Sequence, residues 1–130
     1  MKIKIIVMAA LIMTISGEQA GAAEITMSIN FVGDWCYESV DGSTTNYKLP
    51  SWTEGGVCEK ILSIAPWGFY GEGRHCKPIN VRETKDCAPS GCHHDSLVLA
   101  QCEPDGPVGK GERKQFVFSR YKGHLYVTER

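Results

Sequence analysis

The run Cys92-His93-His94-Asp95 contains the side chains of this sequence that are best suited to chemistry. Together with Cys87, and with His75 further back, it offers the thiolate and imidazole groups that zinc prefers. Adjacent histidines on a strand point to opposite faces, so His93 and His94 cannot easily hold one ion together. The paired spacings of a structural zinc site are absent. Metal binding through residues 87–95 is therefore the second interpretation, behind disulfide formation.

Nucleophilic catalysis is also disfavoured. His94 and Ser96 lie on one face of the expected strand, but alternation turns Asp95 away from both, so no triad is assembled. The sequence has no G-x-S-x-G motif and no C-x-x-C motif. A cysteine held in a bridge cannot attack a substrate. We therefore expect no catalytic residue and no cofactor, and we expect that the protein is not an enzyme.

A β-hairpin is expected around the turn residues Ala88-Pro89-Ser90-Gly91. Pro presets φ for a turn and Gly supplies positive φ, which is typical of a short hairpin loop. Pairing across this loop makes one face apolar, because Ile79 and Val81 then face Ala100 and Val98. A slip by one residue would turn that face over, so this pattern supports the register.

The same register suggests how the six cysteines pair. Six cysteines can pair in many ways, and the hairpin favours one of them. The expected bridges are Cys87–Cys92 at the tip, Cys76–Cys102 across a bulge near Pro78, and, by elimination, Cys36–Cys58.

Residues 1–23 have the pattern of a secretory signal peptide. Lys2 and Lys4 precede an apolar run over residues 5–15, and Ala20-Gly21-Ala22 matches the A-x-A rule. The run is too short to span a bilayer as a mature helix, so no membrane anchor is expected after cleavage. Export to the periplasm or to the medium would expose the cysteines to an oxidising compartment, which favours disulfides.

The remaining residues, 24–130, have the length of a single β domain. The whole chain carries 14 Lys and Arg against 15 Asp and Glu, and this near balance argues against a general nucleic-acid binder. No window shows a sustained helical period, whereas short β-rich runs alternate with Gly and Pro turns. The expected fold is all-β, a small antiparallel barrel or a strongly bent sheet, stapled by disulfides. Strands are expected over residues 31–37, 44–49, 58–64, 74–85, 93–102, 115–120 and 124–128, with a further strand beginning within 66–73.

Three aromatic residues, Trp67, Phe69 and Tyr70, are the expected contact residues for a partner. Pro66 and Gly71 flank them, and aromatic side chains beside flexible backbone are suited to a binding surface. The alternative is that two of the three belong to the core and one is partly exposed.

Two resemblances to known proteins are visible. The stretch Phe31-Val32-Gly33-Asp34-Trp35-Cys36-Tyr37 resembles the G-x-W signature on the first strand of lipocalin-like barrels, through Gly33 and Trp35. This resemblance implies that Trp35 closes the base of a barrel and that an arginine near the last strand packs over it. Arg120 is the candidate for that cation–π contact.

A second resemblance covers more of the chain. The sequence is similar to small exported proteins of soil alphaproteobacteria that mostly have no assigned activity, and this resemblance implies no chemistry. Cys87 and Cys92 are an addition to the shared pattern, which fits a separate tip bridge. The matching positions are Trp35-Cys36, Cys58, Leu62-Ser63-Ile64, Gly68-Phe69, Glu72, Cys76, Val98 to Cys102-Glu103 and Leu125-Tyr126-Val127.

These features predict a monomeric, non-enzymatic binding protein of the periplasm or the medium. Its partner is expected to be an unidentified protein or a small apolar ligand. Inhibition of an extracellular hydrolase is one concrete form of this function, by analogy at the level of fold alone. The alternatives are a metal-binding protein that uses residues 87–95 and a structural protein of the cell envelope.

Overall fold

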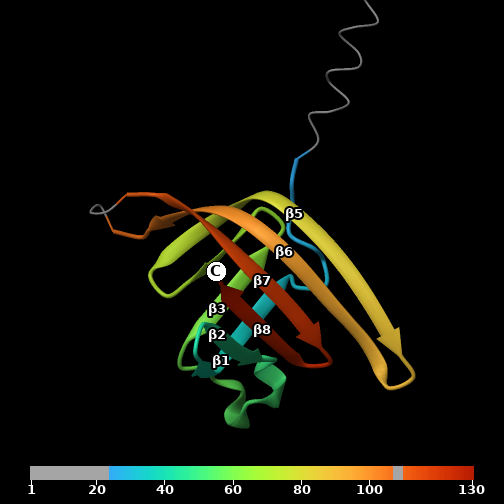
Figure 1. The fold of residues 1–130 in the computed structure, drawn as a ribbon. Helices are drawn as coiled ribbons and strands as arrows, with labels where there is room; N and C mark the ends of the chain where they lie inside the picture. Colours follow the sequence, from blue (N-terminus) through green and yellow to red (C-terminus); the bar gives the residue numbers. More distant parts are fainter. Residues whose placement is uncertain (1–23, 107–109) are drawn as a thin grey trace, which may run out of the picture.

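The computed structural model describes residues 24–106 and 110–130 and shows an all-β protein. Eight antiparallel strands close into a barrel, as Figure 1 shows, so the predicted fold class is confirmed. The predicted signal peptide, residues 1–23, lies outside the described residues. Within the described part of the chain, no helix is long and apolar enough to cross a membrane. The strands are β1 (Gly33–Asp41), β2 (Thr44–Lys48), β3 (Ile61–Ala65), β4 (Gly68–Gly71), β5 (Arg74–Ala88), β6 (Gly91–Pro104), β7 (Glu112–Tyr121) and β8 (His124–Glu129).

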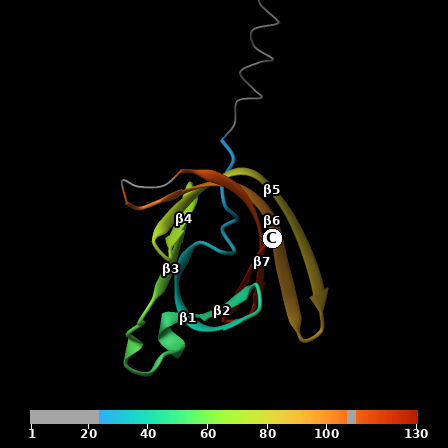
Figure 2. The same ribbon diagram turned by 60° about the vertical axis from the view of Figure 1, so that its left-hand side comes forward.

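The order of strands around the barrel is β1-β2-β8-β7-β6-β5-β4-β3, and β3 pairs with β1 to close it. Strands β3 to β8 form a simple meander, and the β1–β2 hairpin is inserted between its two ends. The chain therefore passes from β2 to β3 beside β1, through two 3-10 turns, η1 (Pro50–Trp52) and η2 (Glu54–Gly56). The Cys36–Cys58 disulfide ties this connection back to β1. Figure 2 shows the strands as a ring, with the blue N-terminal residues inside it.

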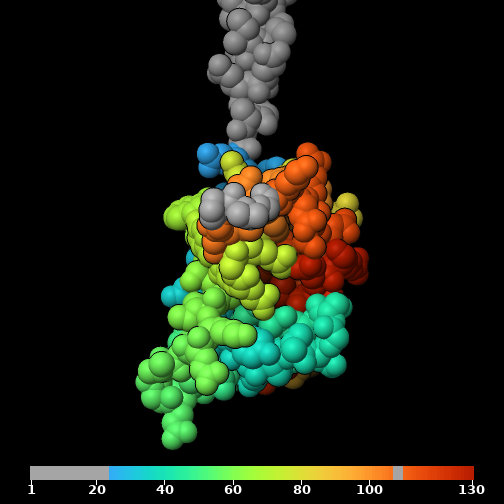
Figure 3. Space-filling view, turned by 90° about the vertical axis from the view of Figure 1, so that its left-hand side faces the viewer, coloured from blue at the N-terminus to red at the C-terminus, as the bar shows by residue number. Residues whose placement is uncertain are grey.

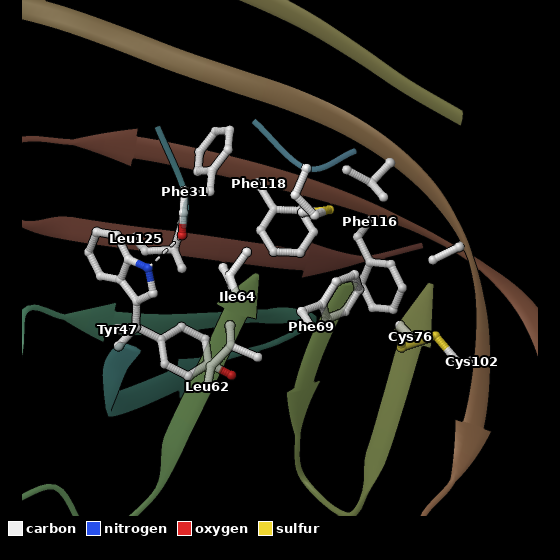
Figure 4. Close-up of a cluster of buried hydrophobic side chains, with 14 residues drawn as sticks. Phe31, Tyr47, Leu62, Ile64, Phe69, Cys76, Cys102, Phe116, Phe118 and Leu125 are labelled. Carbon is white, nitrogen blue, oxygen red and sulfur yellow. Dashed lines mark hydrogen bonds between the residues drawn. A yellow bond between two sulfur atoms is a disulfide. The ribbon is translucent and has the colours of Figure 1, made fainter. Parts of the chain in front are cut away.

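The interior of the barrel is filled by apolar side chains (Figure 4). The ring of Phe69 makes edge contacts with Phe116 and Phe118, with ring centroids 5.1 Å apart in each pair. Leu125 is fully buried beside them. Alternate residues of each strand point inward, which is why these side chains meet in one core.

One end of the barrel is closed by Trp35, which is 1% exposed. Its indole Nε1–H donates a hydrogen bond to the carbonyl oxygen of Phe31, at 2.9 Å. The Arg120 guanidinium lies over the Trp35 ring, 5.1 Å from the centroid, and donates a 2.7 Å hydrogen bond to the carbonyl oxygen of Asn30. The predicted contact between Arg120 and Trp35 is therefore present, whereas the lipocalin resemblance itself stays a prediction.

The β5–β6 hairpin has the predicted register at both of its disulfides. Cys87 pairs with Cys92 and Cys76 pairs with Cys102, and a register shift lies between Pro78 and Asn80. All three predicted disulfides are present.

One detail of the predicted hairpin register was wrong. Val81 faces Val98 as expected, but Pro78, and not Ile79, lies opposite Ala100. Ile79 is the extra residue of the bulge. The cause is the bulge itself, because all pairing on the Cys76 side of it moves by one residue.

The other strands differ from the prediction mainly at their ends. Phe31 belongs to a turn before β1, which begins at Gly33 and continues to Asp41. Strand β3 begins at Ile61 and not at Cys58, because residues 57–60 serve as the connection that carries the disulfide. In the last hairpin, Phe118 pairs with Val127 as predicted.

We expect the two disulfides of the β5–β6 hairpin to stabilise the protein unequally. In the chain-entropy model the Cys87–Cys92 bridge, with a sequence separation of 5, is worth about 2 kcal/mol. The Cys76–Cys102 bridge, with a separation of 26, is worth about 3–4 kcal/mol. Urea unfolding of the two double Cys→Ala variants measures the difference. Equal losses of unfolding free energy would contradict this prediction.

Arg120→Ala should lower the free energy of unfolding by about 2 kcal/mol. The substitution removes the cation–π contact and leaves the partly buried carbonyl of Asn30 without its donor. Arg113→Ala is the matched control, since Arg113 lies exposed on the same strand. If both variants unfold at the urea concentration of the wild type, Arg120 does not hold the end of the barrel together.

Candidate functional site

In the part of the chain that the structure describes, buried apolar side chains fill the interior of the barrel. The space among the side chains at the open end of the barrel amounts to about 50 Å³, which suits water and not an apolar molecule. The core side chains that fill the rest are shown in Figure 4. The larger hollows among the described residues lie at the rim and on the outer surface of the protein.

We call the open end, opposite Trp35, the barrel mouth. It is lined by Tyr47, Glu72, Arg74, Phe116 and Glu129, among others. Figure 3 faces this end, where the teal β1–β2 hairpin, the yellow-green β4–β5 turn and the red end of β8 meet. The mouth joins polar rim residues to an apolar floor, so it is the first candidate site.

A side cleft of about 490 Å³ adjoins the mouth and shares Tyr47 and Glu72 with it. Its other walls include Tyr37, Lys60 and Ile61. The rings of Tyr37 and Tyr47 meet edge to face, with centroids 6.3 Å apart, and the Lys60 ammonium lies 5.1 Å from the centroid of Tyr37. The two aromatic rings are therefore held in place before anything binds.

The rim of the mouth carries a compact cluster of charges. The Glu129 carboxylate accepts hydrogen bonds from the Arg74 guanidinium and, at 3.1 Å, from the Lys114 ammonium. Burial raises the pKa of Glu129, but the hydrogen bonds from Arg74 and Lys114 outweigh it and hold that pKa below its ordinary value. Arg74 also lies over the ring of Phe116, at 5.3 Å. The positive and negative side chains of this cluster pair with each other, and these pairs fix the side chains of the rim in place.

Tyr47 is the residue of the mouth whose pKa is shifted furthest by its surroundings. Burial raises its pKa, the carboxylate of Glu72 adds to the effect, and the pKa reaches about 12. The phenol therefore stays neutral at physiological pH and is not a general base there. It can donate or accept a hydrogen bond in the mouth but cannot supply charge.

The three aromatic residues that the sequence predicts as contacts all lie in the β3–β4 hairpin, but they do not face the same side. Phe69 is 4% exposed and belongs to the core, packed on Phe116 and Phe118. Trp67 and Tyr70 are 63% and 44% exposed. Strand alternation explains the difference, because Phe69 and Tyr70 are neighbours on β4 and must face opposite sides.

Trp67 and Tyr70 are fixed to each other on the outer surface. The indole Nε1–H of Trp67 donates a 2.9 Å hydrogen bond to the hydroxyl oxygen of Tyr70. The ring of Tyr70 lies near that of His75, with centroids 6.4 Å apart. His75 in turn contacts the carboxylates of Glu103 and Asp105, at 3.5 and 3.1 Å. The aromatic pair therefore has a polar, acidic side.

Its other side is an apolar groove of about 540 Å³, which we call the Trp67 groove. Apolar walls come from Ile25, Trp67, Pro78 and Ile79. Glu24, Lys77 and Gln101 add polar groups at its edges. The bulge in β5 matters here, because it contributes Pro78 and Ile79 to this groove.

The stretch from Cys87 to Asp95 does not bring the side chains of a metal site together. Its two cysteines are joined in a disulfide. His93 stacks on Tyr121, with ring centroids 4.4 Å apart. Among the described residues, no group of three His, Cys, Asp or Glu side chains is placed to hold a metal ion.

Ser96 is buried, and its Oγ has no hydrogen-bond partner within the described residues. His94 therefore does not activate it, and no Ser–His–Asp arrangement forms. The serine points into the core beside the strand position of Phe118.

Sequence reasoning missed the mouth, the side cleft and most of the Trp67 groove. Tyr37 and Tyr47 are directly paired across β1 and β2, and that hairpin was predictable from residues 41–43. Ile25, Ile79 and Trp67 come from segments far apart in the sequence, and no pattern of spacing joins them. Comparison with known proteins found no matching family model, curated protein or solved structure.

We expect Tyr47 to ionise only near pH 12, two pH units above an ordinary tyrosine. Because the folded-state pKa is raised, the associated stability is complete below pH 10 and is lost as the pH rises toward 12. The difference in ultraviolet absorption between wild type and Tyr47→Phe, followed against pH, isolates this one tyrosine of five. A difference signal with a midpoint near pH 10 would show that Tyr47 is solvated.

Proposed function

We propose that this chain is an exported, non-enzymatic binding protein that holds a protein partner at Trp67 and Tyr70 and in the Trp67 groove. One observation carries the proposal. Two exposed aromatic side chains are fixed to each other by a hydrogen bond, beside an apolar groove of about 540 Å³, on a barrel whose interior is full.

The physical chemistry of this surface suits protein recognition. Trp and Tyr are the residue types most often found to dominate binding energy at protein interfaces. Because Trp67 and Tyr70 are already tied together, binding loses little side-chain freedom. Apolar side chains exposed together are costly in water, so a partner that covers Trp67 and Ile25 gains the free energy of burying them.

Export is part of the proposal and is supported by two features. Residues 1–23 have the composition of a signal peptide. The six cysteines form three disulfides, which persist in oxidising compartments. Both features fit the periplasm and the medium equally.

A protein partner fits the groove better than a free apolar molecule does. The groove is an open surface channel with Lys77, Glu24 and Gln101 at its edges. A protein segment can place an apolar side chain against the apolar walls while its polar backbone contacts these edge residues. An extracellular hydrolase is one partner of this kind. A metal-binding function is not part of this proposal, because the disulfide takes up the thiols of Cys87 and Cys92.

Trp67→Ala should weaken partner binding by ten-fold or more, because truncation of a central aromatic contact typically costs about 2 kcal/mol or more. Trp52→Ala is the matched control. Trp52, the last residue of η1, is 52% exposed, packs on His124 and is not among the residues that line the Trp67 groove.

A photo-crosslinking amino acid placed at position 67 or at position 52 of the exported chain identifies the contact. We expect a discrete cross-linked partner from position 67 that Tyr70→Ala reduces, and none from position 52. The purified pair then gives the affinities of wild type, Trp67→Ala and Trp52→Ala by calorimetry. Absence of any adduct at position 67, with the protein folded, would favour a structural role in the envelope instead.

A further inference from the structure

Among the residues that the structure describes, one long strand edge has no neighbouring strand. Strand β5 pairs with β4 only through Phe69–Cys76, Tyr70–His75 and Gly71–Arg74. Beyond Cys76 it pairs with β6 alone, as far as Ala88. Figure 2 shows this part of β5 at the outside of the molecule, projecting away from the ring.

Residues 82–88 of this edge are all exposed. Alternate N–H and C=O groups of an edge strand point away from its one neighbour and are available to another strand. Natural proteins usually blunt such an edge with charged side chains. The order of the charges on β5 decides whether they repel a second strand or attract one.

Their order is self-complementary. The sequence from Arg82 to Asp86 is Arg-Glu-Thr-Lys-Asp. When two copies run antiparallel about a two-fold axis at Thr84, each Arg82 lies opposite an Asp86 and each Glu83 lies opposite a Lys85. All four charges of each copy then face an opposite charge, two on each face of the sheet.

Neighbouring registers lack this property. The nearest registers that keep the outward N–H and C=O groups opposite each other are shifted by two residues. A shift in one direction places Glu83 opposite Glu83, and a shift in the other direction places Lys85 opposite Lys85. Like charges directly opposite each other destabilise a strand pair, so the charge order selects the register centred on Thr84.

From this we infer that the protein forms a symmetric homodimer in which the β5 edges of two copies pair antiparallel around Thr84. The two barrels then share one continuous sheet through their β5–β6 hairpins. The Cys87–Cys92 disulfide holds the tip of each hairpin in register next to the contact. The proposed dimer differs from the monomer that the sequence alone suggested, and the experiment below decides between them.

The dimer is expected to be weak and dependent on concentration. One short strand pair buries less surface than a standard protein interface. Its ion pairs are exposed, so added salt lowers the association constant. The contact residues 82–86 do not include any residue of the Trp67 groove, so Trp67→Ala should dimerise like the wild type.

Two charge variants of the full-length chain, expressed with export, test the inference by analytical ultracentrifugation. Arg82→Glu with Lys85→Glu makes the edge wholly acidic, and Glu83→Lys with Asp86→Lys makes it wholly basic. We expect dimerisation of the wild type, at least a ten-fold loss of association for either variant alone, and recovery of the dimer in an equimolar mixture of the two.

The matched control is Lys110→Glu with Arg113→Glu, which changes the net charge as the acidic variant does but at exposed positions away from the edge. It should dimerise like the wild type, and far-ultraviolet circular dichroism checks that each variant is folded. Three results would overturn the inference: a wild type that stays monomeric up to millimolar concentration, single variants that still associate, or a mixture that does not.

Discussion

The burial of Trp35 is the constraint on which the rest of the barrel depends. An indole inside an apolar core needs a partner for its N–H group, and the carbonyl oxygen of Phe31 provides one. That bond holds the chain before β1 inside the end of the barrel, where Phe31 is fully buried. Arg120 then covers the indole from β7 and binds the carbonyl of Asn30. One side chain thus joins the N-terminal segment, the first strand and the last hairpin.

The two ends of the barrel differ in character because of this arrangement. The Trp35 end is filled by aromatic side chains and by the chain before β1. At the mouth, the Glu129 carboxylate accepts hydrogen bonds from Arg74 and Lys114. Apolar side chains fill the described interior of the barrel, so the side chains left for contact with another molecule are those that point outward. Strand alternation supplies them: the same β4 that buries Phe69 exposes Tyr70.

Sequence reasoning succeeded where local pairing decides the structure and failed where distant segments meet. Two of the three disulfides followed from the turn at residues 88–91 and the register beside it, because a hairpin places residues opposite each other by simple counting, and Cys36–Cys58 then followed by elimination. The same counting failed at Ile79, since the position of a bulge depends on the backbone around Pro78. Insertion of the β1–β2 hairpin between β3 and β8 left no local signal. The residues that line the Trp67 groove come from four separate segments, so only the folded chain could show the groove.

The short length of β4 explains why β5 has a free edge. At Gly68, the first residue of β4, a Cβ atom would collide with the carbonyl oxygen of Cys76, so β4 and β5 approach closely there. Their pairing ends at Phe69 and Cys76. The chain before β1 occupies the space beyond, where the backbone N–H of Met27 donates a hydrogen bond to the carbonyl oxygen of Pro66. This segment forms no ladder with β5. The packing that closes the barrel around Trp35 therefore leaves the distal part of β5 outside the closed sheet, with its polar backbone facing solvent. An edge that the fold cannot cover must be protected by charge or used for pairing, and the alternating charges from Arg82 to Asp86 are able to do both.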